Sequence, residues 1–117
     1  MPAFQPVDSL LNAWTINARV NAYLIANTPD EAWRATYAKS DVAAALNESS
    51  QVLAAALRHA LSTDGRIPGF KPDAAAFIAC LFAHDAHRRG QICLLVRQPR
   101  HPISKSAGFG LWEWGTR

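Results

Sequence analysis

The residues best suited to chemistry lie in one short stretch, residues 84–91, which reads His-Asp-Ala-His-Arg-Arg-Gly-Gln. Apolar segments flank this stretch, so a polar cluster interrupts a long apolar helical pattern near its middle. His84 and His87 lie one helical turn apart and could present two imidazoles to one divalent ion. Arg88 and Gln91 follow them, and they could bind an anion or another polar ligand. The stretch predicts either a metal site or an anion site.

The polar cluster shares one stripe of the predicted helix with apolar residues, because a helix has 3.6 residues per turn. The stripe comprises Phe77, Leu81, His84, Arg88, Gln91 and Leu95. We therefore expect this stripe to face the core, with His84 and Gln91 hydrogen-bonded inside it and Arg88 paired with an acid or a carbonyl. A glycine inside a helix costs about 1 kcal/mol relative to alanine, so Gly90 should have a packing reason. We expect another segment to approach the helix closely there, and the aromatic C-terminal tail is the candidate.

Three helices are expected before the helix that carries the polar cluster. The first spans residues 8–26, with Asp8 or Ser9 as its cap. A short second helix opens with a capping box at residues 28–31 and ends near Lys39. The third spans residues 41–62, capped by Ser40 or Asp41.

The long helix that carries the polar cluster is expected at residues 72–97, with Pro72 as its first residue and Pro99 just beyond its end. The tail that follows is too rich in glycine for a helix. Its large apolar side chains should nonetheless lie back across the helices; they are Phe109, Leu111, Trp112 and Trp114. Because no strand series is present, we expect an all-α fold: a single up-and-down helical-bundle domain over residues 1–117.

Composition limits the class of protein. Of 117 residues, 50% are apolar and 18% are charged, which excludes a disordered chain. No apolar run is long enough for a membrane span and no secretory signal is evident, so we expect a cytoplasmic protein without a membrane partner. Cys80 and Cys93 lie about 20 Å apart on one helix, too far to pair, and are expected to be buried free thiols.

The net charge of +3 is unevenly distributed: residues 58–117 hold nine basic and four acidic groups. The basic residues do not cluster with aromatic residues in a known nucleic-acid motif, so a solvated surface is favoured over a nucleic-acid interface.

Several segments together resemble the DinB-like (DNA-damage-inducible) family of helical-bundle proteins. Residues 84–91 are similar to the His-x-x-x-His-Arg-Gly-Gln signature on the last long helix of that family. Other similar segments are residues 69–72, 101–102 and 110–115, together with Asn17 and Asn21. The resemblance implies a bundle in which three histidines hold a divalent metal such as zinc or nickel, one from the second bundle helix and two from the last. His84 matches the first of that last pair.

The chain departs from this pattern at two places. Arg88 stands where the second histidine belongs, and a guanidinium has no lone pair to donate and repels a dication. The helix that would carry the third ligand has no counterpart in this chain, which is shorter than the roughly 150 residues that the resemblance implies. His59 is an unsuitable substitute, because it lies near the end of its helix, about 10 Å or more from the level of His84. We therefore expect a DinB-like bundle with one helix missing and a degenerate metal site.

The expected function is that of a DinB-like protein of unknown specific role, without a resident cofactor or metal-dependent catalysis. The alternative is a hydrolase or thiol-dependent transferase that uses zinc or nickel, bound through His84 and His87. Arg88 and Gln91 suit a small anionic ligand. Loss of a helix would expose an apolar groove, which predicts a homodimer.

Overall fold

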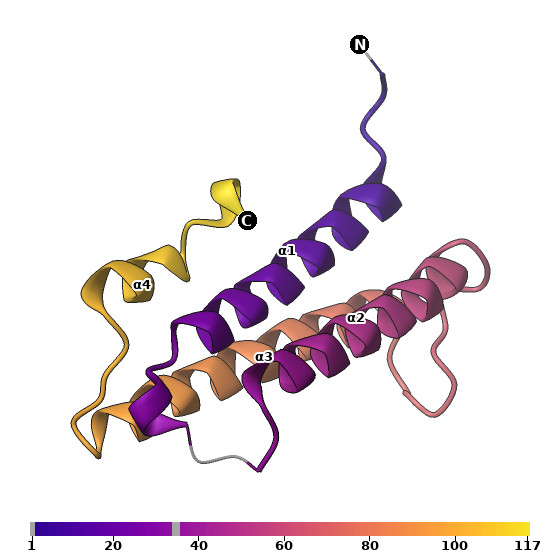
Figure 1. The fold of residues 1–117 in the computed structure, drawn as a ribbon. Helices are drawn as coiled ribbons and strands as arrows, with labels where there is room; N and C mark the ends of the chain where they lie inside the picture. The colour runs from indigo at the N-terminus through magenta and orange to yellow at the C-terminus, as the bar shows by residue number, and fades with distance from the viewer. Residues whose placement is uncertain (1, 34–35) are drawn as a thin grey trace.

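Three long helices form the body of the protein. The computed structural model describes residues 2–33 and 36–117, in which α1 (Pro6–Asn27), α2 (Lys39–Leu61) and α3 (Ala74–Arg97) form an up-down-up arrangement, each helix antiparallel to the one before it in the chain (Figure 1). A short helix, α4 (Lys105–Gly110), and two single turns of 3-10 helix, Asp30–Ala32 and Trp114–Thr116, complete the elements. No strand occurs in these described ranges, so the predicted all-α class is confirmed.

The first helix begins earlier than expected. It starts at Pro6, because proline is favoured at the first helical position, and neither Asp8 nor Ser9 is the cap. The predicted capping box does not form either: the Thr28 hydroxyl donates to the carbonyl of Leu24 at 2.8 Å. The short second helix is therefore reduced to Asp30–Ala32, although residues 34–35 of that prediction lie outside the described residues.

The other helix limits also differ from expectation. Lys39 already belongs to α2, whose cap Ala38 makes no side-chain hydrogen bond. Pro72 precedes α3, because the Asp73 carboxylate caps the helix by accepting from the Ala76 amide at 3.0 Å. The glycine-rich tail does form a helix, contrary to expectation. Ser104 caps α4 by accepting from the Ala107 amide at 3.1 Å, and this local bond offsets the cost of the glycines.

The core lies where the first half of α1 meets the end of α2 and the start of α3. Leu11, Trp14, Leu57 and Ile78 are buried there. The indole of Trp14 donates to the carbonyl of Ser50 at 3.0 Å, and Phe82 packs edge-on against its ring. These contacts fix the three helices at one end of the bundle and leave the second half of α3 to other partners.

The C-terminal tail returns alongside α1, as predicted (Figure 1). The Arg117 guanidinium lies 3.8 Å from the ring centroid of Tyr23. A Cβ at Gly110 would overlap the Tyr23 hydroxyl, so this glycine is where a neighbouring segment approaches closely. The sequence had predicted such a close approach at Gly90, and that prediction was wrong, because a Cβ added there would meet nothing within 4 Å.

Neither free cysteine is fully buried. Cys80 is exposed, which contradicts the predicted buried thiol, and Cys93 is partly buried. Burial raises the pKa of the Cys93 thiol, so it is more fully protonated near neutral pH than a solvated thiol. Among the described helices, none has the length and apolar character to cross a bilayer.

Candidate functional site

The stripe of α3 that carries the sequence motif is exposed. His84, His87, Arg88 and Gln91 all face solvent, and Leu95 at the end of the stripe is 59% exposed. The expectation that His84 and Gln91 hydrogen-bond within the bundle was wrong. These two side chains are exposed because the core extends along this stripe only as far as Phe77 and Leu81.

Arg88 pairs with a carbonyl, as expected, and that carbonyl belongs to the Gln91 side chain. Its Nη1 donates to Oε1 of Gln91 at 3.0 Å. His59, at the other end of the bundle, lines a separate hollow beside the loop between α2 and α3. In the part of the chain that the structure describes, no three His, Cys, Asp or Glu side chains gather as metal ligands would.

A polar network on another side of α3 joins that helix to α1. Asp85 Oδ2 accepts from the side-chain amides of Asn17, at 2.7 Å, and Asn21, at 3.0 Å. Arg89 Nη1 donates to the amide oxygens of the same two residues, at 2.9 Å and 2.7 Å respectively. Each asparagine thus donates to an acid and accepts from a base. Asn17 is completely buried, and its amide hydrogen-bonds on both sides.

The helical period explains why these four residues meet. Asn17 and Asn21 are four residues apart on α1, and Asp85 and Arg89 are four apart on α3, so each pair shares one helix face. In the sequence, Asn17 and Asn21 stand out only through the family resemblance, and no partner was predicted for Asp85 or Arg89. The matched spacing was the signal that could have identified the network.

The network holds a cation in a partly buried position. Burial lowers the pKa of the Arg89 guanidinium, and attraction to Asp85 opposes this effect. Arginine nevertheless stays protonated in proteins. Only Nη1 of Arg89 is engaged by a protein group among the described residues, and its Nε and Nη2 are not sealed from solvent. The asparagines therefore fix the guanidinium while leaving donors for a ligand.

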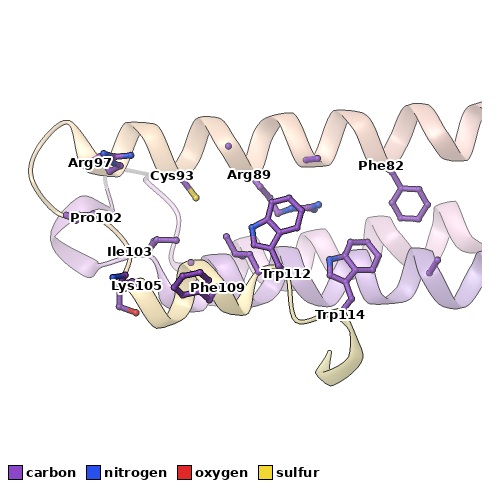
Figure 2. A pocket seen from close by; sticks show the side chains of 16 residues that line it. Phe82, Arg89, Cys93, Arg97, Pro102, Ile103, Lys105, Phe109, Trp112 and Trp114 are labelled. Carbon is purple, nitrogen blue, oxygen red and sulfur yellow. The ribbon is translucent and has the colours of Figure 1, made fainter.

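Arg89 also lines a cavity between α3 and the tail. The cavity has a volume of about 1040 Å³. Figure 2 shows Phe82, Arg89 and Cys93 directed from α3 toward Phe109, Trp112 and Trp114 of the tail, which all line it.

The cavity walls combine apolar surface with positive charge. Within residues 2–33 and 36–117, the charged residues that line it are Arg89, Arg97 and Lys105, and none of the lining residues is acidic. Phe109 and Trp112 remain 63% and 82% exposed although they border the cavity, so the expected burial of the tail aromatics is incomplete. The arrangement can accept an apolar group and an anion together.

Comparisons of the chain with protein-family models, with curated proteins and with solved structures found no match.

Proposed function

We propose that this chain is a DinB-like bundle with one helix missing that acts by binding a ligand, without metal-dependent catalysis. The observation that supports this most strongly is Arg88, which occupies the position where the resemblance requires a second histidine. Its guanidinium is held by Gln91 and cannot donate a lone pair to a metal. A catalytic zinc site needs about three protein ligands and an open position for water. His84 and His87 supply at most two, on an exposed surface.

The proposal is tested by the metal content of protein purified without chelator. We expect no stoichiometric zinc, nickel or manganese in the wild type. The Arg88→His variant should take up zinc more tightly, because it restores a pair of histidines four residues apart on one helix. His84→Ala in the Arg88→His background is the matched control and should abolish the gain. One equivalent of metal in the wild type, lost in His84→Ala, would instead support the metal-dependent hydrolase or thiol-dependent transferase.

The ligand of the proposal is a small anion. The sequence offered Arg88 and Gln91 for it, but these side chains are exposed and pair with each other. Arg89 is partly buried and held by two asparagines. An anion that binds Arg89 therefore loses less free energy to ordering the arginine side chain than an anion that binds the exposed Arg88. Arg88→Met and Arg89→Met therefore form a matched pair: only the second should lose anion binding.

The proposal includes a homodimer, because two helices carry large apolar side chains in contact with water. Leu46 and Val52 of α2 and Leu94 and Leu95 of α3 are exposed. A second copy would remove this surface from water. Light scattering at micromolar concentration should give twice the chain mass of 12.8 kDa. Val52→Glu or Leu95→Glu should shift the protein toward monomer, and a wild-type monomer would contradict the dimer.

A further inference from the structure

We propose that the cavity between α3 and the tail binds a small amphipathic carboxylate, with its carboxylate on Arg89 and its apolar body against the aromatic tail. This inference rests on the proposed function, since it names the ligand class and the site of a chain that acts by binding. The site lies on the side of α3 away from His84 and Arg88, so it is distinct from the motif stripe.

The apolar part of the ligand follows from the walls. Phe82 and Cys93 of α3 and Trp112 and Trp114 of the tail border the cavity, which at about 1040 Å³ is large enough for a ligand of drug size. Trp112 is 82% exposed in the structure, and burying a tryptophan against an apolar body is strongly favourable. Because burial raises the pKa of Cys93, its neutral thiol adds apolar contact and does not repel an anion.

The charge of the ligand follows from the lining. Among the residues that the structure describes, three cations and no acidic residue border the cavity, so an anion is attracted and a cation is repelled. Arg89 is the cation that the protein positions, because Asn17 and Asn21 both accept from its Nη1. Its remaining donors suit a carboxylate, which a guanidinium binds through two parallel hydrogen bonds.

Gly90 completes the site. It lies in the middle of α3 beside Arg89 and lines the cavity, yet an added Cβ would meet nothing within 4 Å. A glycine there costs helix stability without accommodating another protein segment. Its absent side chain leaves room for a ligand to lie against the helix backbone.

Decanoate, below its micelle concentration, is a suitable probe, with decanol and decylammonium as neutral and cationic controls of equal length. Titration calorimetry should detect decanoate binding to the wild type, with binding of decylammonium weaker by about tenfold or more. Gly90→Leu should lose decanoate binding by a similar factor. Leucine is a better helix former than glycine, so the variant remains folded and its loss reports a filled cavity.

Two further variants test the charge. Arg89→Met should weaken decanoate about tenfold while decanol binding changes little, and Arg88→Met, one residue along and on the exposed stripe, should bind decanoate as the wild type does. The inference is overturned if the wild type binds no decanoate at millimolar concentration, if decylammonium binds equally well, or if Gly90→Leu binds normally. Loss of binding in Arg88→Met alone would assign the anion to the motif stripe and also overturn it. A metal-free protein that fails to bind decanoate contradicts this inference only, and the proposed function would still hold.

Discussion

The two sides of α3 differ in the contacts that their side chains make with the rest of the protein. On one side His84, Arg88 and Gln91 face water, and the only side-chain hydrogen bond among them joins Arg88 to Gln91. On the other side Arg89 is hydrogen-bonded to two asparagines of α1 and borders the cavity between α3 and the tail. Adjacent residues of like type, Arg88 and Arg89, thus have different environments. The residues of one short motif are thus divided between an exposed stripe and the side of the helix that borders the cavity.

The largest effect should come from breaking the polar network. Asp85→Ala removes the acceptor for both asparagine amides and leaves the partly buried Arg89 without its nearby carboxylate. We expect the free energy of unfolding to fall by about 2 to 3 kcal/mol. His84→Ala, on the exposed stripe, should change it by no more than about 0.5 kcal/mol. Urea unfolding of both variants measures the contrast, and equal losses would remove the distinction between the two sides.

Two glycines should respond to alanine with opposite signs. Gly110→Ala places a Cβ against the Tyr23 hydroxyl and should destabilise the docked tail by about 1 to 3 kcal/mol. Gly90→Ala meets open space inside a helix and should stabilise the protein by about 0.5 to 1 kcal/mol. Thermal unfolding gives both signs in one experiment. A destabilised Gly90→Ala would mean that another segment occupies the cavity.

The smallest effect concerns the two thiols. Cys93 borders the cavity with a raised pKa, whereas Cys80 is exposed. Because a raised pKa lowers the thiolate fraction at a given pH, alkylation of Cys93 should be slower than that of Cys80 near pH 8 and should accelerate as the pH rises. Mass spectrometry of iodoacetamide-treated protein distinguishes the sites. Decanoate should slow Cys93 further and leave Cys80 unaffected; equal protection of both would argue against a ligand in the cavity.

The positions of the long helices could be predicted from the hydrophobic period and the candidate caps. Their end residues could not, because they depend on competing local hydrogen bonds. Thr28 illustrates this, because its hydroxyl can cap a following helix or bond back to Leu24, and the sequence does not determine which. The buried side of α3 was harder to predict. Phe77, Leu81 and Leu95 make the motif stripe look apolar, yet the core ends before His84.

The cavity could not be predicted from the sequence. It depends on where residues 102–114 return alongside α1 and opposite α3, which is fixed by tertiary contacts such as Gly110 against Tyr23 and Arg117 over the same ring. The polar network was closer to prediction, because the spacing of Asn17 with Asn21 and of Asp85 with Arg89 is visible in the sequence. Only their pairing across two helices required the structure.

Amide and indole NMR of the wild type, titrated separately with zinc and with decanoate, would compare the two sides of α3 directly. Decanoate should shift the resonances of Gly90, Arg89 and the Trp112 indole, while one equivalent of zinc should leave His84 and His87 without a saturable site. Saturable zinc shifts at His84 and His87, with no response of Gly90 or Trp112 to decanoate, would contradict this expectation.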